Sequence, residues 1–131
     1  MFFRLSHIAI GKKGEKAAIK FLKAKCFDIL FRNFISDNRT GEIDIVARDG
    51  EILCFVEIKT RHSSVHIDNS SEETWLRKHQ ADRIIDAAND YLTKIRTPAV
   101  KYRFDLIEIE FGRLGLKNIS HWEKGFGMKE S

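Results

Sequence analysis

The sequence predicts a single α/β domain in which helices flank a mixed β-sheet. Three observations support this: two long segments with helical spacing of apolar residues, five shorter segments of β-type composition, and their order along the chain. The order is α-β-β-β-α-β-β, which is typical of one layered domain. Because 131 residues is the length of one ordinary domain, residues 1–131 are interpreted as a single unit.

The composition excludes several classes of protein. Hydrophobic residues make up 43% and charged residues 32%, which excludes a disordered chain. No apolar run is long enough to span a membrane, and Arg4 and His7 interrupt the N-terminal apolar residues. Cys26 and Cys54 are too few for a zinc site or a disulfide framework. We therefore expect a soluble, cytoplasmic protein that has no membrane partner.

Positive charge is concentrated near the N-terminus. Residues 1–40 carry nine Lys and Arg against three Asp and Glu, a balance of +6, whereas residues 41–131 carry fourteen against sixteen, a balance of −2. A basic end on a slightly acidic domain suggests a surface that faces phosphates, and hence a nucleic-acid partner.

The first helix is expected from Ile8 to about Lys25, with Ala18, Ile19 and Leu22 on its apolar stripe. Four lysines share another face at the same spacing: Lys12, Lys16, Lys20 and Lys23. This lysine row is either a solvated helix surface or a track for nucleic-acid phosphates.

The first three strands are expected at residues 27–34, 43–48 and 51–60. Asp49-Gly50 separates the last two segments and is a signature of a two-residue hairpin loop. Residues 61–72 are polar and are expected to form a loop.

A second helix is expected from about Ser71 to Ile95, with Pro98 after its end. Residues 102–110 and 118–123 complete the sheet.

The hairpin is expected to place three charged residues on one face. A two-residue loop at 49–50 sets Asp44 opposite Phe55, and Glu57 diagonal to Asp44 on the same side. Lys59 follows on that face, because side chains alternate along a strand. The opposite face is uniformly apolar and consists of Ile43, Ile45, Ala47, Cys54, Val56 and Ile58.

A divalent cation would explain two carboxylates on a partly apolar face. Mg²⁺ prefers oxygen ligands, here Asp44, Glu57 and the backbone carbonyl of Ile58. Lys59 would then orient water and offset charge on a phosphate, which suits phosphodiester hydrolysis.

The alternative is a plain salt bridge between Lys59 and Glu57 or Asp44. Two observations favour the cation. Glu15 lies on the apolar stripe of the first helix, where its carboxylate needs a cation or a donor. Glu42 is expected opposite Glu57, and facing like charges cost energy unless a cation lies between them or the strand ends first.

With these residues in hand, the chain resembles the YraN family of uncharacterised bacterial proteins, which are similar to Holliday-junction resolvases. The matching stretches are Gly11-Lys-Lys-Gly14-Glu15 with Ala18, Arg32-Asn33, Gly41-Glu-Ile-Asp-Ile-Val-Ala47, Phe55-Val-Glu-Ile-Lys-Thr-Arg61, Arg103-Phe-Asp105 and Phe126. The resemblance implies a restriction-endonuclease-like core of the PD-(D/E)xK type. It also implies that Glu15, Asp44, Glu57 and Lys59 are its site residues.

Two positions depart from the family pattern. Gln80 stands where the family commonly has a lysine, and the loop after Arg61 lacks the usual glycine. Together with the lysine row, Arg61 and Gln80 are the candidate nucleic-acid contacts. His62, His66 and Asp68 are interpreted as solvated loop residues, with a loop metal site as the alternative.

The resulting hypothesis is an endonuclease that uses Mg²⁺ or Mn²⁺ to hydrolyse DNA, with branched or junction DNA as a candidate substrate. The alternative is a catalytically silent module of the same fold that binds nucleic acid or docks a partner. The sequence is also compatible with RNA as the substrate and with a homodimer.

Overall fold

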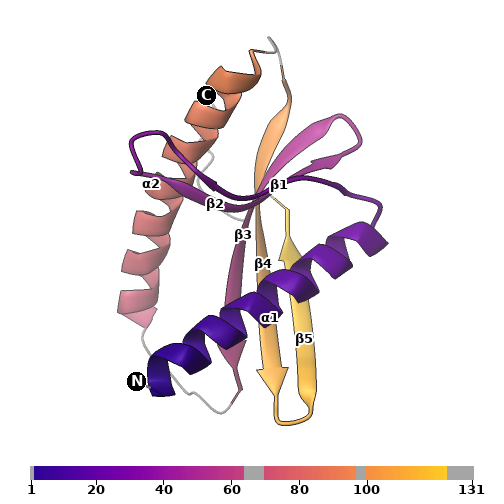
Figure 1. Cartoon of the computed structure of the whole chain (residues 1–131), viewed down its shortest axis with the longest axis vertical. Coiled ribbons are helices and arrows are strands. Elements are labelled where there is room, and N and C mark those ends of the chain that lie inside the picture. Colours follow the sequence, from indigo (N-terminus) through magenta and orange to yellow (C-terminus); the bar gives the residue numbers. More distant parts are fainter. Residues whose placement is uncertain (1, 64–69, 97–99, 124–131) are drawn as a thin grey trace.

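The computed structural model describes residues 2–63, 70–96 and 100–123. The elements follow the predicted order: α1 (Phe2–Ala24), β1 (Asp28–Ile35), β2 (Glu42–Asp49), β3 (Ile52–His62), α2 (Ser70–Ile95), β4 (Tyr102–Gly112) and β5 (Gly115–Trp122) (Figure 1). The predicted α/β fold class with a mixed sheet is therefore confirmed. Within the described ranges, no helix is long and apolar enough to cross a membrane.

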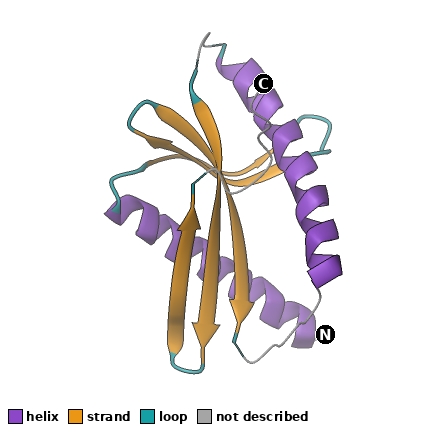
Figure 2. Ribbon diagram, turned by 180° about the vertical axis from the view of Figure 1, so that it is seen from behind, coloured by secondary structure: helices purple, strands orange, loops and turns teal. Residues whose placement is uncertain are grey.

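The sheet has five strands in the order β1-β2-β3-β4-β5. Only β3 and β4 pair in parallel, because α2 carries the chain between them; the other neighbours are antiparallel. Helix α1 crosses the face turned toward the viewer in Figure 1, and α2 runs along the other side (Figure 2).

Each helix covers its own apolar cluster. The cluster under α1 consists of Ala18, Leu22, Phe27, Ile45, Ala47, Cys54, Val56, Ile107 and Ile109. The cluster under α2 consists of Phe34, Ile43, Val46, Leu53, Phe55, Ile84, Ala87, Ala88 and Phe104. Both faces of β2 and β3 are thus buried, as expected for central strands of a layered α/β domain.

Helix α1 begins at Phe2, earlier than the predicted Ile8, and strand β3 ends later than predicted. Helix α1 ends in a Schellman motif, in which Phe27 N–H bonds the Leu22 carbonyl and Cys26 N–H bonds the Lys23 carbonyl. Cys26 takes the left-handed position (φ 67°) where glycine is usual. Strand β3 continues through His62 into the expected loop, because β4 supplies a partner for each added residue.

The hairpin register differs from the predicted one. Asp49 pairs with Ile52, so the two loop residues are Gly50 and Glu51, and Gly50 alone has a positive φ of 59°. That pattern fits a type II′ turn. Val46, not Asp44, therefore lies opposite Phe55. The shift is two residues, so the paired residues from Ile45 to Asp49 keep their predicted faces.

Strand β2 leaves β3 after the Ile45–Val56 pair, although its pairing with β1 continues to Glu42. Beyond this point β2 passes under α2, and a Cβ at Gly41 would lie 2.3 Å from the Arg83 carbonyl oxygen. Ile43 consequently packs in the cluster under α2, which corrects its predicted place beside Ile45.

The contact at Gly41 generates a stability prediction. Gly41→Ala should lower the free energy of unfolding by about 2 kcal/mol, because the new methyl group must push the α2 backbone away. Gly11→Ala is the control: its Cβ meets nothing within 4 Å, and alanine should stabilise the helix by about 0.5–1 kcal/mol. Urea unfolding measures both changes. Equal effects of the two substitutions would contradict the close approach at Gly41.

Candidate active site

The fork between β2 and β3 brings Asp44 and Glu57 together. Extending the Ile45–Val56 pair by one residue places Asp44 opposite Glu57 instead of diagonal to it. The two carboxyl groups are hydrogen-bonded to each other. Asp44 Oδ2 also accepts a hydrogen bond of 2.8 Å from the Ile58 N–H, so this carboxylate takes the place of a β2 backbone carbonyl.

The pKa values of Asp44 and Glu57 are both raised, so this carboxyl pair retains a proton. Burial, followed by the charge and hydrogen bond of Asp44, raises the pKa of Glu57 to about 9, although Lys59 opposes the shift. Burial also raises the pKa of Asp44; the Ile58 N–H and Glu57 oppose this, and Glu42 and Glu15 add to it. The pair therefore carries one proton, which one carboxyl group donates to the other.

Lys59 lies near the pair without neutralising it. It lowers the pKa of Glu57 through charge, yet among these three described residues no ion pair joins Lys59 to either carboxylate. The simple salt bridge, which was the alternative from sequence, is not what the structure shows. Lys59 is half-buried, and its positive charge acts on Glu57.

Glu15 reaches the edge of the site from α1. Its Oε1 accepts hydrogen bonds from Arg32 Nε at 3.3 Å and Asn33 Nδ2 at 3.2 Å. The register of β1 places Asn33 opposite Asp44, in a left-handed conformation (φ 54°) that asparagine tolerates. Arg32 and Asn33 thus supply the donors that Glu15 was expected to need. The negative charge of Glu15 also raises the pKa of Asp44.

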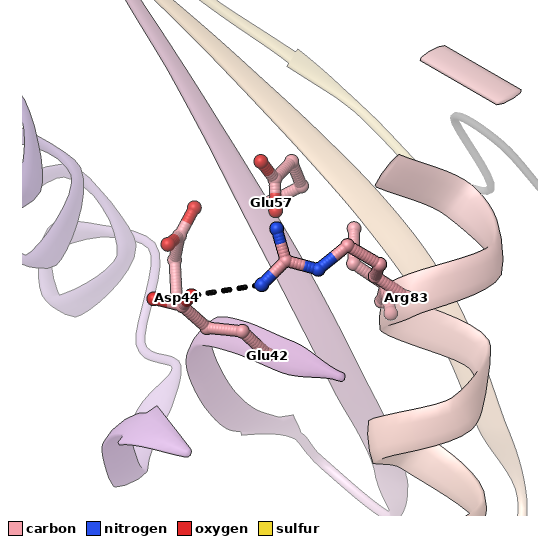
Figure 3. A pocket seen from close by; sticks show the side chains of 5 residues that line it. Glu42, Asp44, Glu57 and Arg83 are labelled. Atoms are coloured by element: carbon pink, nitrogen blue, oxygen red, sulfur yellow. Dashed lines mark hydrogen bonds and ion pairs between the residues drawn. The ribbon is translucent and has the colours of Figure 1, made fainter. Parts of the chain in front are cut away.

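A pocket of about 150 Å³ opens on the α2 side of the pair. Its lining residues are Glu42, Asp44, Glu57, Arg83 and Ile84. Figure 3 shows the Arg83 guanidinium extending from α2 across the pocket, and its Nη2 lies 3.5 Å from Glu42 Oε2. The observed register contradicts the predicted pairing of Glu42 with Glu57. The charge of Glu42 still raises the pKa of Glu57, and Arg83 provides a cation beside it.

The lysine row and Arg61, which are candidate nucleic-acid contacts, lie outside this pocket. The lysine row of Lys12, Lys16, Lys20 and Lys23 is exposed along α1. Arg61 is exposed, and its Nε lies 3.9 Å from Glu110 Oε2. Gln80 lies in α2, one turn before Arg83, and its side chain is outside the described part of the structure. His66 and Asp68 fall outside the described residues, as do Pro98 and Phe126.

The donors at the fork fit a hard divalent cation. No set of three or more His, Cys, Asp or Glu side chains converges within the described residues, so side chains alone supply two ligands. Mg²⁺ is commonly held by one or two carboxylates completed by water and substrate phosphate. The Ile58 carbonyl faces the same gap as its N–H, because both groups of a strand residue point to one edge.

Sequence reasoning missed Arg83 and the role of Asn33. Arg83 is exposed on α2 and directly precedes the buried Ile84, so it lies just beside the apolar stripe of the helix. The sequence offered one signal for Arg83: it is a cationic residue one helical turn after the candidate contact Gln80. Asn33 was noted within a matching stretch, but its pairing opposite Asp44 depends on the β1 register, which includes a bulge between Ile29 and Phe31.

The retained proton predicts a pH dependence for the metal-free protein. Because the folded pKa of Glu57 is about 9 and its ordinary value is 4.5, the folded state binds more protons than the unfolded state between these pH values. Stability should therefore fall as pH rises through this window. In Glu57→Gln, the decrease in the free energy of unfolding over this pH window should be smaller by on the order of 2 kcal/mol.

Urea unfolding from pH 5 to 9 in EDTA measures this dependence. Glu51→Gln, at an exposed turn position of the same hairpin, should behave like the wild type. The raised pKa would be contradicted if the Glu57→Gln profile fell as steeply as the wild-type profile.

Comparison with known proteins identifies the family. A family model described as "Uncharacterised protein family UPF0102" matches residues 14–109. A UPF0102 protein of Chlorobaculum parvum is 40% identical over 114 residues, covering 87% of this chain and 84% of its own. One from Acetivibrio thermocellus is 40% identical over 107 residues, covering 82% and 79%. The match spans the whole site from Glu15 to Lys59 and Arg83, and the chain belongs to the uncharacterised protein family UPF0102.

Proposed function

We propose that this protein is a metal-dependent endonuclease that hydrolyses phosphodiester bonds in DNA, with branched DNA as the candidate substrate. The observation that carries the proposal is the Asp44–Glu57 pair, two adjacent carboxyl groups that share a proton at a fork between strands. A proton in this position is what a divalent cation would displace.

The neighbouring residues suit the same chemistry. Asp44, Glu57 and the Ile58 carbonyl would hold Mg²⁺ or Mn²⁺; when bound, the ion supplies Lewis-acid polarisation of a phosphodiester and a lowered pKa for attacking water. Lys59 would orient that water and offset charge that develops on the phosphate. Water would attack phosphorus and lose a proton to solvent, one P–O ester bond would break, and the departing alkoxide would take up a proton from solvent.

Glu15 would act through its hydrogen bonds instead of by contact with the reacting atoms. It fixes Asn33 and Arg32 beside Asp44, and its negative charge favours a cation at the fork. It becomes a further ligand only if its side chain leaves Arg32. Glu15 is therefore a positioning residue.

Nucleic acid as the substrate is supported by charge. The lysine row presents exposed ammonium groups on α1, the helix that also carries Glu15. The resemblance to resolvases favours DNA junctions within that class. The rival reading, a silent module of the same fold, shares the binding surface and differs only in turnover.

The first functional prediction concerns metal binding. Millimolar Mn²⁺ or Mg²⁺ should raise the melting temperature, because a ligand at ten times its Kd adds about 1.4 kcal/mol of stability. Asp44→Asn keeps an acceptor for the Ile58 N–H but loses the charge, so the rise should vanish. Asp82→Asn, an exposed change on α2, should keep it. A full rise in Asp44→Asn would place the ion elsewhere.

The second functional prediction separates the enzyme from the silent module. Wild-type protein with Mg²⁺ or Mn²⁺ should cleave at least one of a set of duplex, single-stranded, flap and four-way-junction substrates, and EDTA should stop it. Lys59→Ala should retain binding while cleavage falls by a factor of about 10² or more, as expected when a transition-state contact is removed. Identically purified Lys117→Ala, an exposed change on β5, should cleave normally.

Binding without cleavage by the wild type would favour the silent module. Equal cleavage by Lys59→Ala and wild type would reveal a contaminating nuclease and remove support for the enzyme.

A further inference from the structure

We propose that Arg83 forms a phosphate-binding subsite beside the carboxyl pair, with Glu42 as its resting partner. The inference rests on the proposed function and adds a residue to it: the guanidinium would bind a backbone phosphate of the nucleic acid as that strand enters the pocket. Arg83 lies on α2, on the other side of the sheet from the lysine row of α1.

The charges lining the pocket call for such a residue. Three of its five lining residues are Glu42, Asp44 and Glu57, and Arg83 is the one cation among them. A phosphodiester that approaches three carboxyl groups meets repulsion even after one divalent ion is bound. A cation on the α2 side of the pocket would offset that repulsion where the nucleic-acid strand must lie.

The resting contact of Arg83 is weak enough to be exchanged. Its Nη2 lies 3.5 Å from Glu42 Oε2, and the two side chains are 56% and 45% exposed. Exposed ion pairs of this kind contribute about 0–1 kcal/mol. The guanidinium has five donors, and among the described residues only Glu42 engages it, so a bidentate contact with phosphate remains available.

The backbone beneath Arg83 is held in place. A Cβ at Gly41 would come within 2.3 Å of the Arg83 carbonyl oxygen and 2.7 Å of the Ala87 nitrogen, so α2 and the start of β2 are in close contact here. Ile84, the next residue, is buried in the cluster under α2. Arg83 therefore projects from a fixed point, and only its side chain must move to reach a phosphate.

The chain provides a matched control at the far end of β2. Arg48 forms an ion pair of 3.2 Å with Asp28, and these side chains are 52% and 67% exposed. Arg48 and Arg83 thus have similar exposure and one carboxylate partner each, but Arg48 does not line the pocket.

The test is binding of a fluorescently labelled four-way junction and a duplex of the same sequence in EDTA, over a range of salt concentrations. Arg83→Ala should weaken binding about fivefold to tenfold and flatten the slope of log K against log salt by about 0.9, the effect of one lost phosphate contact. Arg83→Lys should restore the slope but only part of the affinity, because lysine lacks the planar fork. Arg48→Ala should match the wild type.

Three outcomes would overturn the inference. If Arg83→Ala and Arg48→Ala bind alike while wild type binds and cleaves, the subsite is wrong and the proposed function stands. If Arg83→Lys fails to restore the slope, the contact is not with a phosphate. If wild type binds neither DNA, both the subsite and the proposed function fail. Should Arg83→Ala not fold, Arg83→Gln carries the same expectation.

Discussion

The site depends on the fork at which β2 leaves β3. Pairing of β2 with β3 ends at Ile45–Val56, while β3 stays paired with β4 as far as His62. A strand edge that opens inside a domain leaves backbone groups that need partners. Asp44 supplies one by accepting from the Ile58 N–H. The residue proposed to bind metal is therefore also a structural residue, and its position is fixed before any ligand arrives.

A second buried carboxylate shows how this fold treats an acid with a purely structural role. Burial alone would raise the pKa of Asp105, but hydrogen bonds from His121 and Arg103 outweigh it and hold that pKa below its ordinary value. Arg103 contacts Asp105 at 2.8 Å and Asp49 at 3.1 Å. The same sheet thus neutralises one buried carboxylate with cations and leaves Asp44 and Glu57 with a proton. That difference argues against a structural ion pair at the fork.

Much of the fold could be predicted because it follows from local patterns. Element order, the parity of side chains along β2 and β3, and the apolar stripes of both helices are properties of short segments. The turn type could not be predicted, because the loops Asp49-Gly50 and Gly50-Glu51 both place glycine at a position of positive φ. The observed register therefore differs from the predicted one by two residues. The predicted faces of the paired residues survived because that shift is even. Ile43 changed cluster because the fork is a tertiary feature.

The candidate site could be predicted only as far as one hairpin reaches. Asp44, Glu57 and Lys59 lie on adjacent strands with a short connection, so alternation was enough to bring them together. Arg83 is 39 positions from Asp44 in sequence, and its arrival at the pocket depends on how α2 is rotated and where it touches β2. Gly41 sets that contact, since only a residue without a side chain admits the helix backbone so closely. The glycine and the arginine therefore belong to one structural device: the first allows α2 to approach, and the second uses the approach to place a cation among carboxylates.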